Sequence, residues 1–192
     1  MPPPFARRDW TLSPICNENN ISSIQLANSG NLHVIELRAY HEGDIDKMYE
    51  LPFFASKSRL PAPLPPPEVI EGSGEIIQEQ SGRRVIRFSD CYVIKYGLNV
   101  SLTEGQNMLF VRETQSVPVP EIFALYSTNN ETGRKVNYII MENISGRPLD
   151  TVWTQLDSSD KVKISNQLRT HLDILRSVPA PGYFGCIGEE AL

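Results

Sequence analysis

Two residues of this chain have types and spacing that could bind phosphate. Lys95 ends the apolar segment Tyr92-Val93-Ile94-Lys95-Tyr96, and Glu104 lies in the first turn of a helix predicted to open at Ser101. Alternation along a strand places Lys95 on the face of Val93, which we expect to be buried. A buried ammonium group needs a charged partner. An ion pair with Glu104 would hold that ammonium where it can bind the phosphates of a nucleotide.

Two plainer interpretations of this pair remain open. Lys95 could be an ordinary surface lysine at the end of a strand, and Glu104 could only close a Ser-x-x-Glu capping box with Ser101. Glu104 shares a helical face with Met108 and Val111, which directs it toward the sheet. The capping role and the ion pair compete for one carboxylate.

The segments around this pair predict an α+β fold, because β-branched and aromatic runs separated by turn residues are typical of strands. The predicted strands cover residues 75–78, 84–88, 91–96, 122–126 and 136–142, with one helix from Ser101 to about Thr114. A second helix is predicted from about Asp157 to Val178, with apolar residues at three- and four-residue steps. The segment 138–146 is an apolar strand that ends in a polar, glycine-terminated loop, and such a strand end can offer backbone groups to an adenine edge.

The chain divides into four predicted regions. Residues 1–50 are expected to be a poorly ordered extension with one short strand at 32–37, and residues 51–73 form a proline-rich segment. Its prolines favour extended polyproline II structure, as a stiff linker, a strap on the surface or a ligand for a proline-recognising domain. The predicted lobe covers residues 74–146, and a helical region covers 147–192.

Composition excludes several classes of function. The net charge is −5 and the charges are interspersed, so the sequence shows no basic surface for nucleic acid or for an anionic membrane. No segment approaches the length of a membrane span, and Cys16, Cys91 and Cys186 are too widely spaced for a metal site. We therefore expect a soluble, cytoplasmic protein without a metal site of its own.

Taken in order, these segments resemble the aminoglycoside phosphotransferase-like family of kinase-like small-molecule phosphotransferases, in particular its branch from filamentous fungi. The matching segments are 51–55, 60–65, 93–97, 104–112, 117–120, 138–142 and 175–185. The resemblance implies a protein-kinase-like N-lobe, an antiparallel sheet with one helix, followed by the first helices of a truncated C-lobe. It also implies ATP or another nucleoside triphosphate with magnesium as the ligand.

The resemblance assigns roles to five residues. Lys95 would contact the nucleotide phosphates, and Glu104 would anchor Lys95. Met141 would lie at the back of the adenine pocket. Residues 142–144 would form the hinge, with the Glu142 carbonyl and the Ile144 amide facing the adenine.

The family's catalytic residues have no counterpart in these 192 residues. Its His-Gly-Asp-x-x-x-x-Asn loop and the following metal-binding aspartate are absent, so no catalytic or metal-binding residue is predicted. His171-Leu172-Asp173 is only a partial match, because Val178 stands where the asparagine would be. No GxGxxG motif precedes Lys95, and the turn Ser81-Gly82 is left as the candidate to cover phosphates. Activity of this chain alone is not expected.

Two function classes remain open. The first is the nucleotide-binding lobe of a small-molecule phosphotransferase, and the second is a non-catalytic, pseudokinase-like module that binds a protein partner. The helix at 157–178 presents an apolar face, for which we expect exposure, self-association or a protein partner. The sequence does not identify the acceptor substrate.

Overall fold

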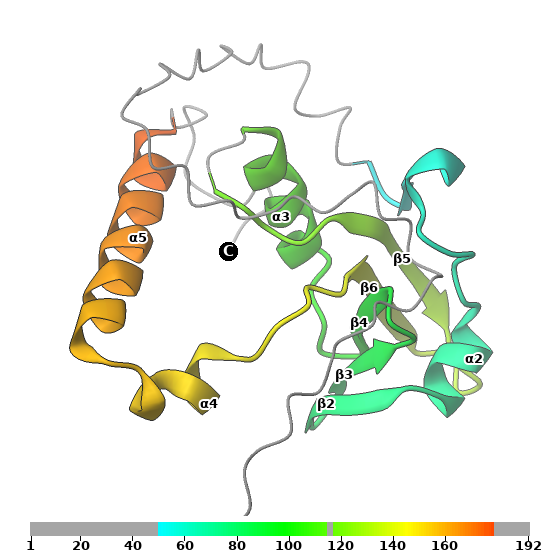
Figure 1. Cartoon of the computed structure of the whole chain (residues 1–192). Helices are drawn as coiled ribbons and strands as arrows, with labels where there is room; N and C mark the ends of the chain where they lie inside the picture. The colour runs from blue at the N-terminus through cyan, green and yellow to red at the C-terminus, as the bar shows by residue number, and fades with distance from the viewer. Residues whose placement is uncertain (1–49, 115–116, 179–192) are drawn as a thin grey trace, which may run out of the picture.

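The computed structural model describes residues 50–114 and 117–178. These residues form an α+β fold around one antiparallel six-stranded sheet in the order β1-β5-β6-β4-β3-β2 (Figure 1). The strands are β1 (Phe53–Phe54), β2 (Glu75–Gln80), β3 (Arg83–Phe88), β4 (Tyr92–Gly97), β5 (Ile122–Asn129) and β6 (Lys135–Glu142). The helices are η2 (Lys57–Arg59), α2 (Pro67–Gly72), α3 (Thr103–Glu113), α4 (Leu149–Val152), η3 (Trp153–Gln155) and α5 (Ser158–Ser177).

The predicted strands and the α+β class are confirmed, and β1 is an addition. At two residues, β1 is too short to show alternation in the sequence, and only its pairing with β5 defines it. The predictions for residues 1–49 and 179–192, which include the strand at 32–37 and the last part of the family resemblance, lie outside the described residues.

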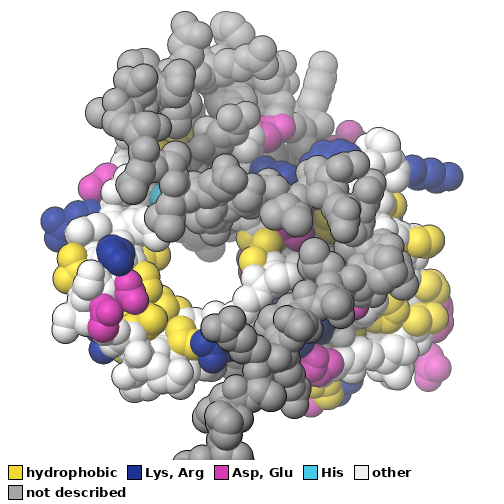
Figure 2. Space-filling model, in the orientation of Figure 1, with side chains coloured by type: hydrophobic (Ala, Val, Ile, Leu, Met, Phe, Trp, Pro, Cys, Tyr) yellow, Lys and Arg dark blue, Asp and Glu magenta, His cyan; other side chains and the backbone are white. Residues whose placement is uncertain are grey.

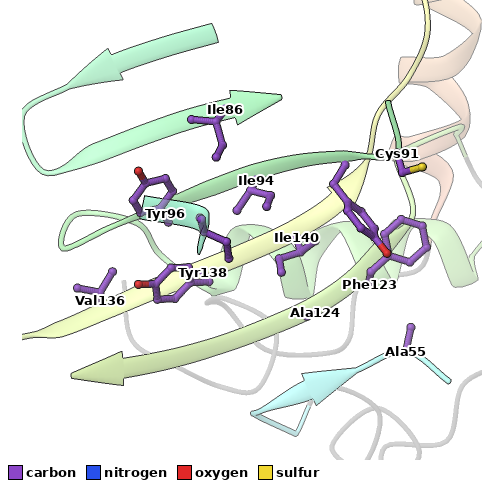
Figure 3. Close-up of a cluster of buried hydrophobic side chains, with 12 residues drawn as sticks. Ala55, Ile86, Cys91, Ile94, Tyr96, Phe123, Ala124, Val136, Tyr138 and Ile140 are labelled. Atoms are coloured by element: carbon purple, nitrogen blue, oxygen red, sulfur yellow. The ribbon is translucent and has the colours of Figure 1, made fainter. Parts of the chain in front are cut away.

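One face of the sheet carries the larger cluster of buried side chains (Figure 3). Strand register aligns a row of aliphatic residues across four strands and, beside it, a row of aromatic ones. The aliphatic row is Ile86, Ile94, Ile140 and Ala124. The aromatic row is Tyr96, Tyr138 and Tyr126, and it stacks with centroids 5.7 and 4.9 Å apart. Such cross-strand contacts fix the register of the sheet.

The proline-rich segment covers this face, so it is a strap on the surface and not a free linker. Leu60, Ala62 and Leu64 pack against the cluster, and Ile70 of α2 is fully buried in it. Tyr92 Oη donates a hydrogen bond to the Ala62 carbonyl. Pro67 begins helix α2, where the expected polyproline II conformation gives way to helix because proline is tolerated in a first helical turn.

Helix α3 packs on the opposite face of the sheet. Leu109 of α3 joins a second buried cluster that contains Leu125 from β5 and Ile139 from β6. The helix approaches β5 closely at Gly105, where a Cβ atom would lie 2.1 Å from Leu125 Cδ2. Absence of a side chain at Gly105 therefore sets the distance between α3 and the sheet.

The predicted capping box at the start of α3 is wrong. The helix begins at Thr103, and no side chain caps it. Ser101 Oγ accepts a hydrogen bond from the Thr103 amide at 3.3 Å, and the Glu104 carboxylate pairs with Lys95 instead. The ion pair stabilises the fold more than the cap would. An ammonium on the sheet needs a charged partner, whereas a helix amide can bond to water.

Helix α5 forms where the sequence predicts it, with Asp157 as its N-cap accepting from the Asp160 amide at 2.8 Å. None of its residues is buried, and on its apolar face Leu168, Leu172 and Leu175 are exposed, whereas Ile164 is half-buried. Hydrophobic side chains are visible on the surface of α4 and α5 in Figure 2. No helix within the described residues is long and apolar enough to cross a membrane.

Candidate functional site

The structure brings Lys95 and Glu104 together. Lys95 Nζ, from strand β4, donates to Glu104 Oε2 in the first turn of α3. The Lys95 side chain is 17% exposed, whereas that of Glu104 is 45% exposed. The Lys95 side chain is thus mostly covered by its neighbours, the Glu104 side chain is more accessible, and the hydrogen bond between them is exposed. This arrangement holds the Lys95 ammonium at the surface of the sheet, beside the Glu104 carboxylate.

Apolar side chains lie beside Lys95 on the same face of the sheet. The register pairs Lys95 with Val85 of β3 and with Ile139 of β6, and it pairs Val93 with Met141. Val85 and Val93 are half-buried, and Met141 is 9% exposed. A held cation next to a partly open apolar surface suits a ligand that has both an anionic group and a flat apolar ring.

Val93 is less buried than the sequence analysis expected. The fully buried residues of β4 are Tyr92, Ile94 and Tyr96, which lie on the opposite face under the strap. Both faces of β4 carry apolar side chains, because the strap covers one face of the sheet and helix α3 packs on the other. The residues on the Lys95 face are the more open ones.

The predicted hinge residues lie at the end of β6. The Glu142 amide donates to the Glu121 carbonyl at 2.8 Å, and Glu142 Oε2 accepts from the Glu121 amide at 3.1 Å. Asn143 bonds back to the start of β4 through the Cys91 carbonyl at 3.1 Å. The Ile144 side chain is 60% exposed, and its amide takes no part in the hydrogen bonds found among residues 50–114 and 117–178. The segment is therefore anchored as far as Asn143.

The Ser81-Gly82 turn lies beside the end of β4. The Asn99 amide donates to the Gly82 carbonyl at 2.8 Å, and Asn99 Nδ2 donates to the Ser81 carbonyl at 3.2 Å. A Cβ on Gly97, which has φ +144, would lie 2.2 Å from the Gly82 carbonyl oxygen. Gly97 therefore permits this close approach, two positions after Lys95. The sequence offers one signal for this approach, a glycine that follows the predicted strand.

A buried carboxylate was missed by the sequence analysis. Glu121 is 5% exposed, and it lies between an arginine from the strap and an arginine from α3. Arg59 Nε donates to Glu121 Oε1 at 2.7 Å, and an Arg112 Nη atom donates to Glu121 Oε2 at 3.0 Å. These residues are distant in sequence and follow no shared period, so no pattern could have joined them.

The partial catalytic match on α5 has ordinary surroundings. Asp173 pairs with Arg176 one turn later at 3.6 Å, and it is exposed. Within the part of the chain that the structure describes, no three histidine, cysteine, aspartate or glutamate side chains form a group able to hold a metal ion.

Comparison with known proteins finds partial matches. No family model matches the chain. Two curated proteins, subtelomeric hrmA-associated cluster proteins from two strains of Aspergillus fumigatus, are each 34% identical to it over 88 residues. Each match covers 46% of this chain and 17% of the relative, so the chain spans under a fifth of the relatives' length. A solved structure, WaaP in complex with acyl carrier protein, is 20% identical with a TM-score of 0.34, covering 41% of this chain and 34% of that one.

Proposed function

We propose that residues 74–146 form the nucleotide-binding lobe of an aminoglycoside phosphotransferase-like small-molecule kinase. The observation that carries the proposal is the ion pair between Lys95 on β4 and Glu104 on α3. In protein kinases, an ion pair between a strand lysine and a glutamate of the following helix must be in place for phosphoryl transfer. The order of motifs in the sequence supports the same assignment.

The residues present suit a nucleoside triphosphate. Lys95 would bind its phosphates as a charge-assisted donor, and Glu104 would hold the ammonium in position. The half-buried side chains of Val85 and Val93, together with the buried Met141, would contact the base. The Glu142 carbonyl and the Ile144 amide would pair with the adenine edge. Magnesium would enter with the nucleotide, where it neutralises phosphate charge.

No step of phosphoryl transfer is assigned to the residues described. That reaction depends on positioning and on charge neutralisation by a base and metal ligands. The proposal for this lobe is therefore nucleotide binding, and the acceptor substrate is left open.

Nucleotide binding can be tested by titrating a fluorescent ATP analogue with magnesium into the full chain. Lys95→Met should weaken binding at least about tenfold, the equivalent of ~1.4 kcal/mol. Lys163→Met is the matched control, because Lys163 also pairs with a carboxylate, Asp160 at 3.0 Å, but on α5. Equal affinity of the wild-type chain and Lys95→Met, or no binding by the wild-type chain, would refute the proposal.

The second candidate function is a pseudokinase-like module that binds a protein partner. The exposed apolar side chains of α5 favour it, since contiguous apolar patches mark interaction surfaces. Tight partner binding that is unaffected by Lys95→Met would support this alternative over nucleotide binding.

A further inference from the structure

Helix α3 is tied to the sheet by an ion pair at each end. Glu104 in its first turn pairs with Lys95, and Arg112 in its last turn pairs with Glu121 at 3.0 Å. Arg112 also donates to the Val119 carbonyl at 3.3 Å. Between these ends, Gly105 lets the helix lie close against β5. Gly105 therefore sets the distance of α3 from the sheet, and the two ion pairs hold its two ends in place.

The carboxylate at the second end is shared with the strap. Both contacts from Arg59 reach Glu121 Oε1, at 2.7 Å from Nε and 2.6 Å from an Nη atom, whereas Arg112 reaches Oε2. Each oxygen therefore has its own guanidinium. The Glu121 side chain is 6% exposed, while those of Arg59 and Arg112 are 48% and 39% exposed. The strap and the helix thus meet at one buried acid.

A buried carboxylate has a strong requirement for its partners, because water cannot replace them. Losing Arg59 would leave Arg112 as the remaining guanidinium on Glu121, and Oε1 would lose its charged partner. Arg112 would then shift toward the uncovered oxygen, carrying the end of α3 with it. The strap is also held on β5, which begins directly after Glu121, because the Ala55 amide donates to the Phe123 carbonyl at 2.8 Å.

We propose that the strap sets the position of α3 through Arg59, so that Arg59 is a positioning residue for the Lys95–Glu104 pair. Arg59 fixes Glu121, Glu121 fixes Arg112, and the helix then places Glu104 against Lys95. The effect on nucleotide affinity rests on the function proposed above. The effect on the helix itself does not.

The test combines hydrogen–deuterium exchange of the nucleotide-free chain with titration of the fluorescent ATP analogue. Arg59→Ala should lower the protection of α3 amides about tenfold and leave the amides of β4 and β6 unchanged. It should weaken nucleotide binding about tenfold, a typical size for coupling between sites. Arg59→Lys, which keeps the charge, should recover both quantities to within about threefold.

Arg84→Ala is the matched control, because Arg84 pairs with Glu79 on the sheet face away from α3 and has a similar exposure, 37% against 48%. It should leave α3 protection unchanged. Unchanged α3 protection in Arg59→Ala would overturn the proposal, as would an equal loss across helix and sheet. Should Arg59→Ala fail to fold, Arg59→Gln takes its place: α3-specific loss of protection in that variant supports the proposal, and unchanged or uniform protection overturns it. A wild-type chain that binds no nucleotide contradicts the proposed function, while the exchange data still decide the role of Arg59.

Discussion

The Glu104 carboxylate could either cap its helix or neutralise Lys95, and in the structure it pairs with Lys95. We predict that Glu104→Gln weakens nucleotide binding several-fold, because the amide no longer holds the ammonium by charge. Stability should fall by less than about 1 kcal/mol, since the pair is partly exposed. Thermal unfolding and nucleotide titration measure the two effects. Ser101→Ala serves as the control and should alter neither, and a large loss of stability in Glu104→Gln would contradict a role in binding.

Gly105 shows how the space left by an absent side chain can matter more than helix propensity. Alanine is favoured over glycine in a helix by about 1 kcal/mol. A Cβ at this position would nevertheless lie 2.1 Å from Leu125 Cδ2, and Leu125 is fully buried, so it has no free space to move into. We predict that Gly105→Ala destabilises the fold by about 1–3 kcal/mol in chemical denaturation. Increased stability would mean that α3 can move away from β5 without cost.

Tyr126 provides a prediction about pH. Burial raises the pKa of Tyr126 from 10.0 to about 12. The folded state therefore keeps this proton at pH values where the unfolded chain has lost it, so stability is intact below pH 10 and falls between about pH 10 and 12. The pKa of Tyr138 is also raised, mainly by burial. Tyr126→Phe should thus reduce the alkaline loss of stability without abolishing it, as followed by tyrosinate absorbance and denaturant titration at several pH values. An unchanged alkaline slope in Tyr126→Phe would refute this.

The elements of the sheet could largely be predicted from the sequence, because β-branched and aromatic runs between turn residues are local signals. The helix α5 and its Asp157 cap are local in the same way. The position of the strap on the sheet could not be predicted, because a proline-rich segment has the same sequence pattern whether it is free or packed. The Lys95–Glu104 pair could be proposed from spacing, whereas the Glu121 contacts depend on a tertiary approach that no local pattern encodes.

The strap is also attached to the sheet through helix α2. Tyr138 Oη donates to Glu71 Oε1 at 2.6 Å, from the centre of the aromatic row. We predict that Tyr138→Phe costs about 1 kcal/mol of stability, less than is usual for a bond to a charged group because Glu71 is exposed and stays solvated. Chemical denaturation measures this cost. Glu71→Gln keeps an acceptor and should cost less, and equal stability of Tyr138→Phe and the wild-type chain would show that this bond contributes nothing.

At the scale of the whole molecule, the sheet and helix α5 differ in how far their apolar residues are buried. The sheet is covered on one face by the strap and on the other by α3, so its central strands are buried. Helix α5 has no comparable layer among the described residues, and it stands apart from the sheet in Figure 1. Apolar surface that stays in contact with water favours association.

We predict that this surface makes the chain self-associate. Leu168 and Leu172, one turn apart on α5, are 52% and 49% exposed. The double variant Leu168→Glu, Leu172→Glu should raise the dissociation constant of the associated form at least about tenfold and reduce binding of a hydrophobic dye, without lowering the unfolding temperature. Sedimentation at increasing concentration measures the first effect. Ile77→Glu is the control, because Ile77 is 50% exposed on the distant strand β2. An equal effect of Ile77→Glu would show that association depends on exposed apolar side chains in general and not on the α5 face. A wild-type chain that stays monomeric and binds no dye would show that the α5 face does not drive association.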